Sequence, residues 1–126
     1  MNDITHAPDA AIVAAHNDAF RRHVCLGSPY PDDLPRLEGK LVCTAAVAAK
    51  GMLFVDTCRR TVGFFAEFPE DDDPHGHHDF GSIRIGETKV LWKIDAYDRD
   101  YDYGSEDPSD PAQTARVLTI LFPADW

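Results

Sequence analysis

Two segments with alternating apolar residues, joined by a tight Gly–Glu turn, limit the folds that this chain can adopt. The segments FGSIRI and TKVLWKIDAY flank that turn, a pattern typical of an antiparallel β-hairpin. In the longer segment every second residue is apolar, which predicts one buried face. We therefore predict a hairpin over residues 80–85 and 88–97, with Trp92 and Ile94 in the core.

Two amphipathic helices are predicted in the first half of the chain. In residues 9–24 apolar side chains recur at helical spacing, and Asp9 is placed to cap the helix or to favour its first turn. A second apolar face predicts a helix over about residues 52–63. The segment CLGSPYPDDLPRLEGK has three prolines and two glycines, so it is predicted to be a loop.

Three further segments have the composition of β-strands. Residues 115–122 (ARVLTILF) are apolar on both faces, which predicts a central strand covered on one side by helix. The other two candidates are KLVCTAAVA (40–48) and the short segment GFFAEF (63–68). The fold class that follows for residues 1–126 is a single acidic α+β domain, in which two helices pack on one face of a four- or five-stranded, mostly antiparallel sheet.

The net charge of the chain comes entirely from its second half. Residues 1–66 carry seven acidic and seven basic side chains, whereas residues 67–126 carry fifteen acidic and five basic ones, which accounts for the formal charge of −10. Such a field repels a bare phosphate backbone and attracts a basic protein surface. The composition thus argues against direct nucleic-acid binding and favours a basic protein partner.

Aromatic residues lie among these acids, a combination that favours protein recognition. Carboxylates can reproduce the charge pattern of a phosphate backbone, and tyrosines supply anchors that hydrogen-bond at their tips. The kind of partner expected is a nucleic-acid-binding protein complex. The predicted partner-binding residues are Glu70, Asp71, Asp72, Asp73, Asp98, Asp100, Tyr101, Asp102 and Tyr103.

The motif DPHGHHDFG, residues 73–81, admits a metal-binding interpretation and a structural one. Imidazole and carboxylate groups bind divalent metals such as zinc, and the candidate ligands are His75, His77, His78 and Asp79. Their spacing does not match the HExxH helix, in which two ligands share one helical face. The structural interpretation is a turn that begins at Asp73, with Asp79 accepting backbone N–H bonds ahead of the next strand.

Five short blocks of the sequence resemble those of a known bacterial family. They are NDAFRR, DPHGHHDFG, WKIDAYD, YGSEDPSDP and TARVLTILF, and the resemblance covers about residues 16–122. In this order the blocks resemble domain of unknown function 3768, a family found mostly in alphaproteobacteria and often on mobile elements. The family's pattern usually has Glu at the position of His77 and Tyr at the position of Ala96. The resemblance implies a genomic setting and no particular activity.

These observations favour a small interaction protein that is not an enzyme and needs no cofactor. An acidic protein carried on mobile elements, able to cover a basic nucleic-acid-binding surface by nucleic-acid mimicry, fits the behaviour of inhibitors of host defence complexes, including anti-CRISPR proteins. The alternative is a metal-dependent enzyme that uses the DPHGHHDFG loop. The chain has three scattered cysteines, no apolar segment approaching about 20 residues and no signal-peptide pattern, so we expect it to be cytoplasmic, without membrane contact.

Overall fold

The first helix begins and ends at the residues that its sequence signals indicate. In the computed structural model, which describes residues 9–126, helix α1 spans Ala10–Leu26. The carboxylate of Asp9 accepts a hydrogen bond from the backbone N–H of Ala11 at 2.9 Å and so caps the N-terminus. Gly27 ends the helix in the left-handed conformation, with φ of 73°, and its N–H bonds to carbonyls of the last turn.

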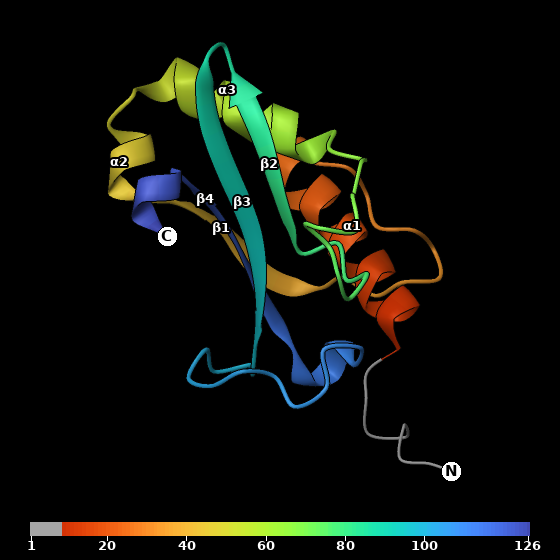
Figure 1. The fold of residues 1–126 in the computed structure, drawn as a ribbon. Helices are drawn as coiled ribbons and strands as arrows, with labels where there is room; N and C mark the ends of the chain where they lie inside the picture. Colours follow the sequence, from red (N-terminus) through yellow and green to blue (C-terminus); the bar gives the residue numbers. More distant parts are fainter. Residues whose placement is uncertain (1–8) are drawn as a thin grey trace.

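The other long elements are one helix and four strands. Their bounds are Met52–Gly63 for α3, Glu38–Cys43 for β1, Phe80–Ile85 for β2, Thr88–Tyr97 for β3 and Ala115–Leu121 for β4. The strand order is β1-β4-β3-β2; β1 and β4 are parallel, and the other two pairs are antiparallel. Helices α1 and α3 pack on one face of this sheet (Figure 1), which confirms the predicted α+β fold. No helix within residues 9–126 is long and apolar enough to cross a membrane.

The strand predicted over residues 40–48 is wrong in its second half. The strand ends at Cys43, and a short helix, α2 (Ala45–Ala48), follows at once. The reason is a helix cap: the Thr44 hydroxyl accepts a hydrogen bond from the backbone N–H of Val47 at 3.3 Å. Local capping therefore overrides the β-propensity of this stretch.

The strand predicted over residues 63–68 is wrong altogether. Gly63 ends α3, and residues 64–68 form a connecting segment that belongs to no strand. Phe64 is exposed, whereas Phe65 and Phe68 reach the core and lie edge-on to Trp92 with ring centroids 5.4 and 6.1 Å away. The apolar residues that suggested a strand are thus used for packing between the helical layer and the sheet.

The buried core lies between the sheet and the two long helices. Trp92 of β3 is completely buried and pairs in register with Ile120 of β4, and Phe20 of α1 belongs to the same apolar cluster. Gly81 of β2 leaves room for the indole, because a Cβ atom at this position would lie 2.4 Å from the indole nitrogen. The predicted burial of Trp92 and Ile94 is confirmed.

Three long connecting segments adjoin strand termini at the same end of the sheet. According to the strand register, β1, β2 and β4 begin at this end and β3 ends there. Residues 27–37 before β1 and residues 64–79 before β2 lead to this end on the side of the helices, and residues 98–114 connect β3 to β4 beyond it (Figure 1). Most of the residues that the sequence predicts to be functional belong to these three segments.

Candidate functional site

The DPHGHHDFG motif forms a turn that is organised by a buried aspartate. One oxygen of the Asp73 carboxylate accepts hydrogen bonds from the backbone N–H groups of His77 at 3.0 Å and His78 at 3.2 Å, and the side chain is only 5% exposed. Gly76 and His78 have left-handed backbone conformations, with φ of 69° and 55°. The acceptor of the backbone bonds is therefore Asp73 and not, as predicted, Asp79, because the carboxylate that starts the turn lies inside it.

Asp73→Ala is expected to lower the free energy of unfolding by about 1–2 kcal/mol, because it leaves two N–H groups of the turn without their acceptor. The matched control is Asp72→Ala, since the Asp72 side chain is exposed. A change within about 0.5 kcal/mol is expected for this control. Urea denaturation followed by circular dichroism measures both variants, and equal losses would show that the Asp73 bonds do not stabilise the turn.

His78 connects this turn to helix α1. Its Nδ1–H donates to the Asp18 carboxylate, with distances of 3.0 and 3.1 Å to the two oxygens, and its Nε2 lies 3.8 Å from an oxygen of Asp73. The imidazole also stacks face to face on Phe68, with ring centroids 3.9 Å apart and an interplanar angle of 4°. Two carboxylates and an aromatic ring therefore fix the His78 side chain between loop and helix.

Arg21 lies next to this contact and is completely buried. Its guanidinium donates to Asp18 at 3.0 Å and to the backbone carbonyl of Phe65 at 2.9 Å. Asp18 thus accepts hydrogen bonds from both Arg21 and His78. A guanidinium that is withdrawn from water needs such acceptors, because an unpaired buried charge is strongly destabilising.

Asn17 and Arg116 join two of the long connecting segments to each other. The Asn17 side chain donates to the backbone carbonyl of His77 at 2.9 Å and accepts from Nε of Arg116 at 2.7 Å. Nη2 of Arg116 in turn donates to the backbone carbonyl of Pro108 at 2.7 Å. The segment before β2 and the segment between β3 and β4 are therefore held through the same side-chain amide on α1.

Sequence reasoning did not find this buried polar network. Its central members are Asn17, Asp18, Arg21 and Arg116. Residues of these types are mostly exposed in folded proteins, so their burial has no local signal. The one available pointer was that all four fall in the blocks NDAFRR and TARVLTILF, which carry the family resemblance.

The four predicted metal ligands do not converge on one point. His78 is directed toward Asp18, whereas His75 is exposed, and the rings of His75 and His77 are 5.9 Å apart. Asp79 is half-buried, and this burial raises the pKa of its carboxyl group. Within residues 9–126 no group of three or more His, Cys, Asp or Glu side chains is placed to hold a metal ion.

The predicted partner-binding residues divide into exposed ones and ones that stabilise their own loops. Asp73 is buried in its turn, and Asp98 accepts hydrogen bonds from two backbone N–H groups of the following residues, at 3.1 Å each. Tyr101 has a φ of 62°, and its hydroxyl donates to Glu38 at 3.2 Å. The residues that remain exposed are Glu70, Asp71, Asp72, Asp100, Asp102 and Tyr103.

Acidic residues gather where the three connecting segments lie. Residues 27–37, 64–79 and 98–114 together contain fourteen of the 22 acidic residues of the chain, but only two of its twelve Lys and Arg. Asp32 and Asp33 belong to this set although they come from the electrically neutral first half of the sequence. We call these three segments the acidic end. It is a product of strand order and direction as well as of composition.

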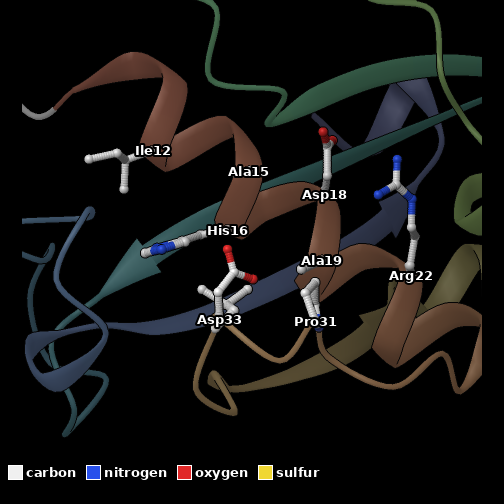
Figure 2. Close-up of a pocket in the computed structure, with 9 residues that line it drawn as sticks. Ile12, Ala15, His16, Asp18, Ala19, Arg22, Pro31 and Asp33 are labelled. Carbon is white, nitrogen blue, oxygen red and sulfur yellow. The ribbon is translucent and has the colours of Figure 1, made fainter.

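A pocket of about 430 Å³ lies on helix α1 beside residues 31–34 (Figure 2). Its lining is partly apolar, through Ile12 and Leu34 among others, and partly polar, through His16, Arg22 and Asp33. His16 is only 7% exposed, and its Nδ1 is buried without a hydrogen-bond partner in the described part of the chain. No local sequence pattern indicates this pocket, because one wall is helix α1 and the other is the connecting segment that folds back on it.

The family model described as "Protein of unknown function (DUF3768)" matches residues 43–125. No curated protein and no solved structure matches the chain. The family match includes the DPHGHHDFG turn and Arg116, and it leaves out α1, which supplies Asn17 and Asp18. The match covers more than half of the sequence, and the chain therefore belongs to the DUF3768 family.

Proposed function

We propose that this protein works by protein–protein contact, with its acidic end covering a basic nucleic-acid-binding surface of another protein. On this proposal it is an inhibitor of a host defence complex, of the anti-CRISPR type, that acts by nucleic-acid mimicry. The observation that carries the proposal is the charge of the acidic end, where fourteen acidic residues stand beside two basic ones. Such a field attracts proteins that otherwise bind phosphates.

The exposed carboxylates of the acidic end are open to a partner. Glu70, Asp71 and Asp72 form one exposed run, and Asp100 and Asp102 are exposed in the next acidic segment. Beside them Tyr103 is 77% exposed. An exposed tyrosine among charged residues is a common anchor of protein interfaces, since it buries a large ring and keeps a polar tip.

Charge reversal at the acidic end tests the proposal. The variant combines Asp100→Lys with Asp102→Lys, and the control adds the same charge at the opposite end of the sheet through Glu87→Lys, Met52→Lys and Leu53→Lys, which are all exposed. We expect the reversal to slow association with a basic partner by ~10-fold or more at low salt, because steering depends on the local field. The control should change the association rate by less than about 2-fold.

Purified CRISPR effector ribonucleoproteins, mixed with their target DNA, provide the assay. Inhibition of DNA binding that weakens as salt rises would support the proposal, because screening shortens the field of exposed charges to ~8 Å at physiological ionic strength. Equal inhibition by the wild type and the reversed variant would contradict a role for the acidic end. Absence of inhibition for every effector at every salt concentration would contradict the inhibitor function.

A further inference from the structure

One face of the sheet is covered by helices α1 and α3, and no long helix within residues 9–126 covers the other (Figure 1). Side chains alternate between the two faces of a strand. Trp92 on β3 is buried under the helices, so its neighbours Leu91 and Lys93 point to the opposite side. We call the surface formed by these alternate residues of the four strands the open face.

The open face is a basic surface in an acidic chain. Four of its side chains are cationic and two are anionic: Lys40, Arg84, Lys89 and Lys93 against Glu38 and Asp95. Lys93 pairs with Asp95 at 2.8 Å, and Glu38 accepts a hydrogen bond from the Tyr101 hydroxyl at 3.2 Å. No ion pair within residues 9–126 includes the other three cations, all of them exposed, so they are available to an external anion.

Two of these cations repel each other in the absence of a bound anion. Arg84 and Lys89 stand directly opposite each other across the β2–β3 pairing. The guanidinium of Arg84 donates to the backbone carbonyl of Glu87 at 3.1 Å, a neutral acceptor that brings no negative charge. Like charges in this position destabilise a strand pair. Charge complementarity therefore favours an anionic partner for the open face.

Two pockets on the open face each combine a lysine with two aromatic rings. The pocket of about 330 Å³ is lined by Phe80, Lys93 and Trp126, and that of about 350 Å³ by Lys40, Tyr97 and Tyr101. In each pocket the ammonium group lies within reach of a ring. Lys93 Nζ is 5.6 Å from the Trp126 ring centroid, and Lys40 Nζ is 4.7 Å from that of Tyr101.

The two pockets are neighbours across one strand pairing. Asp95 lines the first and Val117 the second, and these residues are register partners on β3 and β4. Asp79, which is half-buried, also lines the first pocket. A ligand that spans both pockets meets a cation and aromatic surface twice. This repetition suits a polymer whose repeating unit holds a flat ring and an anionic group.

We propose that the open face binds single-stranded nucleic acid, with bases stacked on the rings of the two pockets and phosphates held by Lys40, Arg84 and Lys89. Proteins that hold single strands without reading their sequence combine these two kinds of contact. The acidic end repels phosphates, but at physiological ionic strength exposed charges are screened beyond ~8 Å, so the open face acts through its own charges. The contact goes beyond the proposed inhibitor function and does not require it.

Fluorescence anisotropy with a labelled oligothymidylate of about 12 nucleotides tests the open face. We expect saturable binding that weakens as salt rises, with log affinity falling by about 0.7 per unit of log salt for each phosphate contacted. Polyglutamate supplies negative charge without flat rings, so it should compete at least ~10-fold more weakly. Equal competition by polyglutamate, binding of an adventitious polyanion only, would overturn the proposal.

Trp126→Ala removes an exposed ring and should weaken binding of the oligothymidylate by about 5-fold or more. Quenching of tryptophan fluorescence by the same strand reports this stacking in the wild type, because Trp92 is buried and closed to the bases. Absence of quenching, or unchanged affinity of a folded Trp126→Ala variant, would contradict stacking on the open face.

Lys40→Gln combined with Lys89→Gln tests the phosphate contacts. The pair should lower the slope of log affinity against log salt by about 1.4, the value of two phosphate contacts on a single strand. The control, Arg22→Gln with Lys50→Gln, removes the same charge from exposed residues on the side of the helices and should change the slope by less than about 0.3. Equal slopes for the two double variants would overturn the proposal.

Discussion

Replacing Trp92 by alanine is expected to lower the free energy of unfolding by about 3–5 kcal/mol, the range for truncating a large aromatic side chain in a packed core. The indole is completely buried, and Phe65 and Phe68 both lie edge-on to it. The guanidinium carbon of Arg21 lies 5.1 Å from its ring centroid. An alanine would leave a cavity bordered by a helix, a loop and a strand, and no single element can move to fill it.

Equilibrium urea unfolding, followed by circular dichroism, measures this loss. Trp126→Ala is the matched control, because Trp126 is 71% exposed and touches Phe80 edge-on at the surface. Its expected loss is below about 1 kcal/mol. A Trp92→Ala variant that also loses less than about 1 kcal/mol would contradict the placement of the indole in the core.

Asp18→Ala is expected to cost about 3 kcal/mol, because it removes the carboxylate partner of a buried arginine. Arg21 has no exposed side-chain surface, whereas Asp18 is 19% exposed, so the guanidinium cannot turn to water when its partner is lost. The same substitution removes the acceptor for His78 Nδ1 and loosens the DPHGHHDFG turn from α1. The stability loss should therefore appear together with faster amide hydrogen exchange at His77 and His78.

Asp56→Ala on helix α3 is the control for this prediction. Asp56 also pairs with an arginine three residues away, Arg59, and lies 3.3 Å from Arg60, but all three side chains are at least one-third exposed. Exposed pairs contribute little because water screens them, so a much smaller loss than that of Asp18→Ala is expected. Equal losses of unfolding free energy for Asp18→Ala and Asp56→Ala would show that the buried Arg21–Asp18 pair stabilises the fold no more than an exposed pair does.

The fold was predictable where the local spacing of apolar residues matches the set of side chains that the structure buries. Alternation in residues 88–97 indicates a strand in any context, and the apolar run before Phe122 indicates a central, buried strand. Residues 63–68 are misjudged because their phenylalanines fit a strand pattern equally well, while the residues that hold them, Trp92 and His78, come much later in the chain. Such tertiary contacts leave no trace in local composition.

The negative charge of the candidate site was predictable from the sequence, whereas the strand pairing and hydrogen bonds that assemble the site were not. Acidic segments are visible in the sequence, but their position at one end of the sheet follows from a parallel pairing of β1 with β4 that no local pattern encodes. The same limit applies to Asn17 and Arg116, which are 99 residues apart and bond to each other in the core. The prediction that Asp79 accepts the backbone bonds is wrong for a related reason, because both carboxylates flank the turn and packing places Asp73 inside it.

The shared amide of Asn17 determines what kind of surface the acidic end is. Because Asn17 bonds to the His77 carbonyl and, through Arg116, to the Pro108 carbonyl, neither acidic segment can shift without straining the bonds that hold the other. The two segments are therefore anchored to one another at His77 and Pro108, and their carboxylates stand on linked loops and not on independent tethers. On the proposed function, linked loops would lose less conformational entropy on contact than free tethers would, and the spacing of a partner's charges would matter as well as their sign.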